Sequence, residues 1–261
     1  MSKVSVYIIG YNEEKKIEAA IQSVIEWADE VIVVDSHSTD NTASISKKLG
    51  ARVVQVPFEG FGKLRNAALE HCRYPWIFSL DADERCTPAA RDEILKIVRE
   101  DNANVPQVWL MPRKNYFMGK WVKYSGWYPD YRQPQLFKKG MMTYTQLEVH
   151  EGFEAKGPLG KLTNPIWQFP FENLEQIINK ANRYSSLGAK KLFSKKKGSI
   201  TKAVLHGWAE FMQTYFLRLG ILDGRVGFTI ALYNSISTYF KYAKLTELQK
   251  DWKEPSGLPG K

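Results

Sequence analysis

One apolar run closes on a pair of aspartates: Trp76-Ile77-Phe78-Ser79-Leu80-Asp81-Ala82-Asp83-Glu84. The pattern predicts a buried strand whose exposed end presents Asp81 and Asp83 on one face. Two carboxylates so placed repel each other and favour a bound cation. Mg²⁺ and Mn²⁺ take oxygen ligands and often share the ion with substrate phosphates. We therefore expect a divalent metal and a phosphate-bearing substrate at this strand end, with a plain polar turn as the alternative for an Asp-x-Asp triplet alone.

Strand-like and helical segments alternate upstream of this run. Such alternation predicts an α/β fold with a doubly wound, mostly parallel sheet, in which ligands gather at the carboxyl ends of the strands. Asn12 is placed to cap the first helix. The expected strands are 4–9, 31–34, 52–56 and 76–80, and the expected helices are 12–27, 43–49, one beginning after Gly62, and 88–99.

Polar side chains follow three of these predicted strands. Asn12 and Glu13 follow the first strand, Asp35 the second, and Asp81 and Asp83 the fourth. Because the carboxyl ends of parallel strands share one edge of the sheet, these separated segments converge on one crevice.

The length and composition suit one α/β domain with a substantial appendage. The chain has 261 residues, 44% of them hydrophobic, which is enough for a full core. Its two cysteines, Cys72 and Cys86, have no metal-ligand spacing and predict reduced thiols in a cytosolic protein. The run 4–9 is too short and too soon followed by acids to be a signal peptide or a membrane span.

Positive charge is concentrated near the carboxyl end of the chain. The span 176–209 holds eight Lys and Arg and no Asp or Glu, in a chain of net charge +9. The segment 226–240 has no charge, but it is short and polar for a span and is typical of a helix lying in a membrane interface. We expect an anionic membrane surface as partner; packing of these helices on each other, or on a second subunit as a homo-oligomer, is the alternative.

The amino-acid composition changes at two places along the chain. Aromatic residues become frequent after Val105, and they serve either as core or as a sugar-binding cleft. A basic, apolar helical region begins at Glu172. We expect a catalytic domain over 1–171, with a nucleotide-sugar-binding half 1–104 and an acceptor-side half 105–171, then a helical extension 172–253 and a disordered tail 254–261.

Four motifs carry a resemblance to a known family. Their order and spacing resemble those of the inverting family-two nucleotide-sugar glycosyltransferases, over residues 4–100. The resemblance implies a GT-A fold, which is Rossmann-like with flanking helices, here followed by amphipathic carboxy-terminal helices. The motifs are Ile9-Gly10-Tyr11-Asn12-Glu13-Glu14, Val33-Val34-Asp35-Ser36-His37-Ser38-Thr39-Asp40-Asn41-Thr42, Lys63-Leu64-Arg65-Asn66 and Asp81-Ala82-Asp83.

The same resemblance implies roles for residues at the donor side. Asp35 would accept a hydrogen bond from the uracil N3–H, and the segment around Tyr11 and Glu13 would hold the base and ribose. Lys63 and Arg65 belong to the nucleotide-sugar site, with Arg65 near the diphosphate or Asp81.

At the metal, Asp81 would contact the ribose or a metal-bound water, and Asp83 would ligate Mg²⁺ or Mn²⁺ and so help to neutralise the leaving UDP. A loop cap for Asp35 and an ordinary salt bridge for Arg65 are the structural alternatives.

Inversion by single displacement also needs a general base on the acceptor side. Asp130 is the candidate, in an aromatic loop where this family places its base; an aspartate in a turn is the alternative, and Glu148 and Glu151 are weaker candidates. His150 would be a second protein ligand to the metal or a donor to the diphosphate, unless it is a plain core or surface histidine. Arg132 and Gln135 resemble a degenerate form of an element of processive relatives, in a different order that argues against processive synthesis.

A narrower resemblance concerns the acceptor. Trp127-Tyr128-Pro129-Asp130, Val149-His150-Glu151 and the carboxy-terminal helices resemble bacterial lipopolysaccharide-core β-1,4-glucosyltransferases that act on inner-core heptose. This implies a UDP-glucose donor, a lipid-linked saccharide acceptor and a peripheral location on the inner face of the cytoplasmic membrane.

Other functions remain as alternatives. Another nucleotide-sugar donor, or a polyprenyl-linked glycan or protein acceptor, would fit the same motifs. A basic nucleic-acid-binding module gains little support, because no recognised nucleic-acid motif is present, and we expect no nucleic-acid partner. A nucleotidyltransferase is disfavoured because the first strand ends in Gly10-Tyr11-Asn12-Glu13-Glu14 rather than in a basic, Gly-rich phosphate loop.

Overall fold

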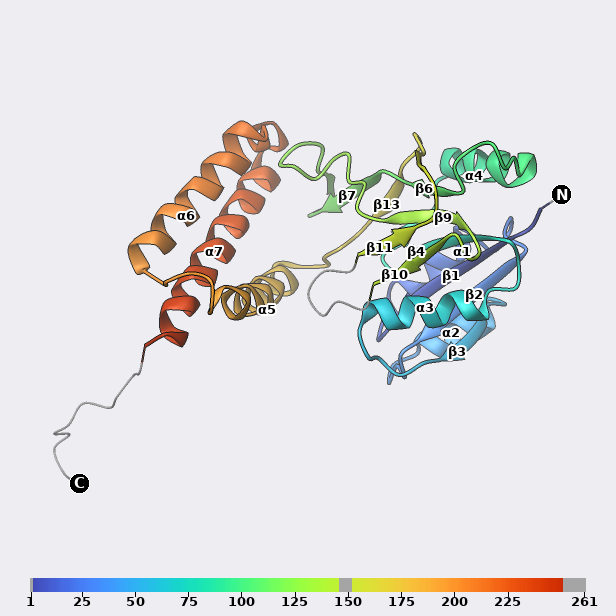
Figure 1. Ribbon diagram of the computed structural model, residues 1–261, viewed down its shortest axis with the longest axis horizontal. Coiled ribbons are helices and arrows are strands. Elements are labelled where there is room, and N and C mark those ends of the chain that lie inside the picture. The colour runs from blue at the N-terminus through green and yellow to red at the C-terminus, as the bar shows by residue number, and fades with distance from the viewer. Residues whose placement is uncertain (1, 146–151, 251–261) are drawn as a thin grey trace, which may run out of the picture. The chain divides into compact units, whose positions relative to one another are not determined.

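The apolar runs of the sequence form the centre of the main sheet. A computed structural model describes residues 2–145 and 152–250. Strands β1 to β4 are parallel and lie in the order β3-β2-β1-β4, which confirms the predicted α/β fold with a mostly parallel sheet (Figure 1). Their bounds are β1 (Val4–Gly10), β2 (Glu30–Asp35), β3 (Arg52–Gln55) and β4 (Trp76–Asp81).

Three later strands extend this sheet beyond β4. β9 (Pro134–Lys138) is antiparallel to β4, and β6 (Val108–Leu110) is antiparallel to β9. β12 (Leu159–Lys161) pairs in parallel with β6 at the edge. A smaller sheet contains β5 (Glu84–Arg85), β13 (Ile166–Gln168) and β7 (Arg113–Phe117), in that order.

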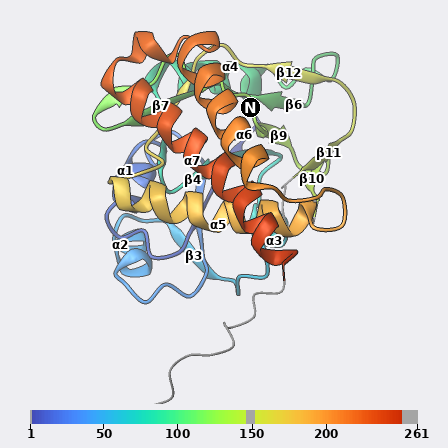
Figure 2. The same ribbon diagram turned by 90° about the vertical axis from the view of Figure 1, so that its left-hand side faces the viewer.

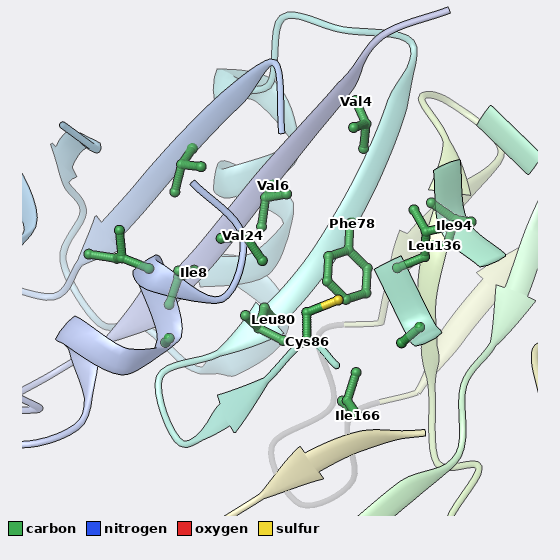
Figure 3. Packing of buried hydrophobic residues seen from close by; sticks show 14 of the residues in the cluster. Val4, Val6, Ile8, Val24, Phe78, Leu80, Cys86, Ile94, Leu136 and Ile166 are labelled. Carbon is green, nitrogen blue, oxygen red and sulfur yellow. The ribbon is translucent and has the colours of Figure 1, made fainter. Parts of the chain in front are cut away.

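Side chains of the main sheet are buried on both faces, as a continuous apolar strand requires. Val4, Val6 and Ile8 point to one core, which Figure 3 shows, and Tyr7 and Ile9 point to the other. α1 (Ile17–Gln22), α2 (Thr42–Lys48) and α4 (Pro88–Glu100) pack on the first face, and α3 (Phe61–His71) packs on the second with β10 (Met142–Tyr144) and β11 (Phe153–Ala155).

The prediction that Asn12 caps a helix over 12–27 is wrong. Asn12 has a left-handed backbone, with φ 55°, and its side chain accepts from the main-chain N–H of Thr39 at 2.8 Å. Hydrogen-bonded turns occupy the residues that follow, so the regular helix is only α1. The side chain that was expected to start the helix instead links two loops.

The described residues form two compact units. The first, here called the sheet unit, comprises Met1–Tyr116 and Tyr128–Pro170; the second, the helical unit, comprises Phe117–Trp127 and Phe171–Lys261. The sequence analysis placed 117–127 in the acceptor-side half, whereas the structure packs this segment with the helices. Asp223 explains the difference, because its carboxylate accepts from the N–H groups of Lys123 and Tyr124 and from the hydroxyl of Ser125.

The helical unit is built on a helical hairpin. α6 (Ile200–Met212) and α7 (Arg225–Leu248) lie side by side and antiparallel, and α5 (Leu174–Leu192) packs on α7 (Figures 1 and 2). Gly207 permits the close approach, since a Cβ there would lie 3.2 Å from the main-chain oxygen of Ser235. A π-helical turn (Gln213–Leu217) and a 3-10 turn (Gly220–Asp223) join α6 to α7, and β8 (Lys120–Trp121) lies in the 117–127 segment.

None of the helices in 2–145 and 152–250 combines the length and the apolar character needed to cross a bilayer. The predicted tail 254–261 lies outside the described residues.

Candidate active site

The predicted carboxylates lie at one edge of the main sheet. Gly10, the last residue of β1, is paired with Asp35, and Ile9 is paired with Asp81. Asp35 and Asp81 therefore end the two strands that flank β1, at nearly the same height. Neighbouring strands are about 4.8 Å apart, so the two residues are roughly 10 Å apart across the sheet.

Arg65 holds Asp81 directly. The Arg65 side chain, on α3, is 4% exposed, and its NH2 group donates to Asp81 Oδ1 at 2.8 Å. Its NH1 group donates to the Ser79 hydroxyl at 3.2 Å. The guanidinium also lies over the ring of Tyr144, 5.5 Å from its centroid. The proximity of Arg65 and Asp81 that the resemblance implied is thus found in the structure.

Tyr144 is fixed from two sides. The Asn66 side chain bonds both main-chain groups of Tyr144, donating to the oxygen at 2.8 Å and accepting from the N–H at 2.9 Å. The Tyr144 hydroxyl lies 2.8 Å from that of Tyr7 on β1. Burial raises the pKa of both Tyr7 and Tyr144, so these phenols stay protonated. They form a neutral, rigid support beneath Arg65.

Asp83 lies in the turn that follows β4, two residues after Asp81. Both side chains are partly exposed, and Asp83 accepts contacts at 3.4 Å from the amide nitrogen of Gln168. Two hard carboxylates, completed by phosphate oxygens and waters, are an ordinary ligand set for Mg²⁺. Within the described part of the chain no group of three His, Cys, Asp or Glu forms a closed metal site. His150, Glu148 and Glu151 lie outside the described residues.

Glu84 organises the turn that carries the two aspartates. It is buried, and its Oε2 accepts from the main-chain N–H of Asp81 and from the side chain of Gln135, both at 2.9 Å. Its Oε1 accepts from Arg113 Nε at 2.7 Å. Burial raises the pKa of Glu84 to about 7, against the lowering effect of Arg113. The sequence analysis gave Glu84 no role, and no local pattern pointed to Arg113 as its partner.

Arg113 also reaches the loop of Asp130. Its NH1 group donates to the main-chain oxygen of Asp130 at 3.3 Å, so one guanidinium joins that loop to the turn of Asp81 and Asp83. The Asp130 side chain is 12% exposed. Arg132 Nε donates to Oδ1 at 2.9 Å and lies 2.8 Å from Oδ2.

The second oxygen of Asp130 is unusual. Oδ2 is buried and, among the residues the structure describes, has no hydrogen-bond donor in good geometry, the nearby Arg132 nitrogen included. Buried carboxylate oxygens without a donor are rare and are found at catalytic positions among others.

Asp35 is committed to its own loop. It is fully buried, and its oxygens accept from the N–H of Ser38 at 3.1 Å, from the Ser38 hydroxyl, and from Gln55 Nε2 at 2.8 Å. Of the two oxygens, Oδ2 accepts two of these bonds and Oδ1 accepts one, so the predicted bond to uracil would use Oδ1. In this structure Asp35 serves as the loop cap that the sequence analysis held as its alternative.

The loops after β1 and β2 are tied to each other. The N–H of Asn12 donates to the Ser38 hydroxyl at 2.9 Å, and the N–H of Glu13 donates to Thr42 Oγ1 at 2.8 Å. Tyr11 stands out of this pair of loops with 58% of its surface exposed. Lys63 of α3, also predicted to belong to the nucleotide-sugar site, pairs with Glu59, which precedes that helix.

Comparison with known proteins identifies what this arrangement is. The model of the family described as "Glycosyl transferase family 2" matches residues 5–151, which is more than half of the chain. The chain belongs to glycosyl transferase family 2. It is therefore a glycosyltransferase, and its sheet unit is the GT-A-like α/β fold predicted from the motifs.

Relatives of this family 2 enzyme align over nearly all of it. An uncharacterized glycosyltransferase of Rickettsia typhi is 30% identical over 259 residues, covering 95% of this chain and 88% of that protein. The lipopolysaccharide core biosynthesis glycosyltransferase LpsC of Rhizobium meliloti is 29% identical over 255 residues, covering 93% and 91%. The match therefore includes the helical unit as well as the catalytic motifs.

A solved structure resembles a smaller part. Glucosyl-3-phosphoglycerate synthase of Mycobacterium tuberculosis, in complex with Mn²⁺, UDP-glucose and phosphoglyceric acid, is 26% identical and covers 43% of this chain and 44% of its own, with a TM-score of 0.37.

Proposed function

We propose that this family 2 enzyme transfers glucose from UDP-glucose, with inversion, to a hydroxyl of a lipid-linked saccharide such as the heptose of a lipopolysaccharide inner core. The observation that carries the proposal is the ion pair between buried Arg65 and Asp81 at the end of β4, two residues before the partly exposed Asp83. A cation and two hard carboxylates at the carboxyl end of a parallel strand support the binding of a diphosphate at this edge.

Arg65, Asp81 and Asp83 would act on the diphosphate and metal of the donor. Arg65 provides positive charge near the diphosphate and fixes the Asp81 carboxylate, while Asp83 holds the divalent ion. A bound Mg²⁺ or Mn²⁺ supplies Lewis-acid stabilisation of the leaving UDP. Exposed Tyr11 and partly buried Glu13 contribute the wall against which the base and ribose lie.

Asp130 would act on the acceptor as the general base. A single displacement needs a base that takes the proton of the acceptor hydroxyl while that oxygen attacks the anomeric carbon. Asp130 Oδ2, which has no hydrogen bond in good geometry among the described residues and lies 2.8 Å from Arg132 Nε, is the oxygen that we propose accepts this proton. Arg113 fixes the main chain of Asp130 relative to the aspartate turn, so both halves of the reaction share one rigid support.

The acceptor class is supported by the relative named for lipopolysaccharide core biosynthesis, which aligns over 93% of this chain. Glucose and the β-1,4 linkage rest on the motif resemblance alone. An acceptor of this class is held in a bilayer, and we place the enzyme peripherally at the inner face of the cytoplasmic membrane.

A donor screen tests this function first. Release of nucleotide is measured across UDP- and GDP-sugars with Mg²⁺, Mn²⁺ or chelator, and then transfer to deep-rough lipopolysaccharide is followed with the preferred donor. We expect UDP-glucose to be used fastest, only with divalent metal, and to give a β-linked product. Preference for a GDP-sugar, activity in chelator, or an α-linked product would each contradict the proposal.

A further inference from the structure

The helical unit combines two surface properties that rarely occur together in a soluble domain. Of the 24 large hydrophobic side chains exposed in the described residues, 18 lie beyond residue 171. The described residues of the same unit, 117–127 and 171–250, hold fifteen Lys and Arg against five Asp and Glu, so this unit accounts for the whole net charge of +9. Exposed apolar area on this scale marks a binding surface.

The exposed residues of the hairpin form one face. On α6, Val204 and Trp208 directly follow Ala203 and Gly207, which are buried toward α7. On α7, exposed Ile236 and Phe240 directly follow Ser235 and Tyr239, the residues that Gly207 approaches.

Geometry places the two apolar rows on the same side. In each helix, the side chain one residue after a contact residue points about 100° further round the helix axis. Figure 2 shows that α6 and α7 lie side by side, and they run antiparallel, so these rotations carry both rows to the same side of the hairpin. The rings of Phe211 and Phe228, 5.8 Å apart, join the rows at the end near the turn.

The third helix borders this face but does not bury its apolar side chains. α5 meets α7 through Lys244, which donates to the Asn182 side chain at 2.6 Å, and through Lys241, which lies against Gly188. Lys241 stands on a different side of α7 from Ile236, whereas Lys244 follows Phe240 by one turn, with its Nζ over the Phe240 ring at 5.8 Å from the centroid. Ile236 and Phe240 remain exposed beside this border.

The turn between the two helices is apolar as well. Leu217 is 80% exposed, and Leu219 adopts a left-handed backbone with φ 55°. A π-helical turn and a left-handed leucine are costly conformations, and they are used here to display apolar side chains to solvent. Arg218 and Arg225 flank the turn and are exposed. The turn, here called the apolar tip, exposes Phe216, Leu217, Leu219, Ile221 and Leu222.

Charge decides what this surface binds. A second copy would bring two strongly cationic units together, which is unfavourable at low ionic strength. Nucleic acid would match the charge but would leave the two apolar rows and the apolar tip in water. An anionic bilayer satisfies both properties, because its headgroups attract the cations and its acyl region takes the apolar side chains.

We infer that the outer face of the α6–α7 hairpin, together with the apolar tip, lies in the interface of an anionic lipid bilayer. The inference deepens the proposed function by naming the surface that would bring the enzyme to a lipid-linked acceptor. It concerns this unit alone and is tested without donor or acceptor.

A site-specific probe on the full chain tests it. Cys72 and Cys86 are buried, so a cysteine introduced as Leu217→Cys takes the environment-sensitive dye NBD in their place. Leu159→Cys, at a 43% exposed position on β12 of the sheet unit, is the matched control. With vesicles of phosphatidylcholine and phosphatidylglycerol we expect a blue shift and a ~3-fold rise in NBD emission at 217 and none at 159.

Three results would overturn the inference. They are no change at 217 with anionic vesicles, equal changes at 217 and 159, and a change at 217 that grows with protein concentration in the absence of lipid, which would indicate a second copy. Leu217→Asp with Leu222→Asp should lower vesicle binding about tenfold or more, from the loss of two apolar side chains. The same variant should hydrolyse UDP-glucose in solution at the unchanged rate, which separates a failure of docking from a failure of the proposed chemistry.

Discussion

Arg113 and Glu84 form a buried ion pair, with 2.7 Å between Nε and Oε1 and no more than 3% of either side chain exposed. Desolvation of such a pair is costly, so its net contribution to stability is small, but the removal of one partner leaves a buried charge uncompensated. The pair lies between the turn of Asp81 and the main chain of Asp130. The pair therefore fixes the spacing of these two segments.

Arg113→Met should therefore lower the free energy of unfolding by about 3–5 kcal/mol, measured by urea denaturation. Arg132→Met is the matched control, since Arg132 is exposed and its pair with Asp130 should contribute less than about 1 kcal/mol. Adding Glu84→Gln to Arg113→Met should restore part of the loss. Equal losses in the two single arginine variants would show that the buried pair has no special role.

Asp130→Asn should reduce the rate of transfer about 10²- to 10⁴-fold, because an amide cannot take the acceptor proton. The fold should survive, since the main-chain bond to Arg113 does not depend on the side chain. Single-turnover transfer and thermal unfolding are measured on the same preparation. Transfer at the normal rate by a folded variant would remove Asp130 as the base.

Arg65 should not be replaceable by lysine. Its guanidinium reaches Asp81 and Ser79 at once and stacks over Tyr144, whereas an ammonium offers no planar fork. We expect Arg65→Lys to lower kcat/KM for donor hydrolysis about tenfold and Arg65→Met more. Lys63→Met, on the same helix, is the control and should have the smaller effect, because Lys63 pairs with Glu59. A larger effect at Lys63 would contradict this ranking.

Both thiols should be inert in the native protein. Burial raises the pKa of Cys72 to about 12 and that of Cys86 to about 12, so almost no thiolate exists at pH 8. Reaction with Ellman's reagent should be slow until the protein is unfolded.

The same pKa values give the pH dependence of stability. The folded pKa exceeds the unfolded value near 9, so the contribution of these thiols is complete below pH 9 and is lost as the pH rises toward 12. Cys72→Ala with Cys86→Ala should therefore show a shallower loss of stability over that window, read from urea midpoints. Rapid thiol reaction at pH 8 in the folded protein would contradict the burial of both residues.

Continuous apolar runs were enough to predict the main sheet, because strands covered on both faces must be apolar throughout. The antiparallel strand β9 could not be placed in the same way. Its partners are β4 and β6, and nothing in Pro134–Lys138 specifies them. The error at Asn12 has a similar origin, since a cap residue and a loop-linking residue are chemically alike and only the partner Thr39 distinguishes them.

The site was predictable where its chemistry is local. Asp81 and Asp83 are close in sequence and meet at one strand end, and Arg65 was recognised from its motif. The network of Glu84, Arg113 and Gln135 was missed, because its members come from β5, β7 and β9 and meet only after folding. Asp35 carried a recognisable motif, but its burial beneath the Ser38 loop could not be read from that motif.

The central claim is a division of labour, in which Asp83 serves the donor with its metal and Asp130 serves the acceptor. Titration calorimetry of UDP with and without Mn²⁺, on the unaltered enzyme, Asp83→Ala and Asp130→Asn, tests it without any acceptor. We predict that Mn²⁺ strengthens UDP binding, that Asp83→Ala weakens the Mn²⁺-dependent affinity about tenfold or more, and that Asp130→Asn leaves it unchanged. UDP affinity that ignores Mn²⁺, or that falls equally in both variants, would contradict the account.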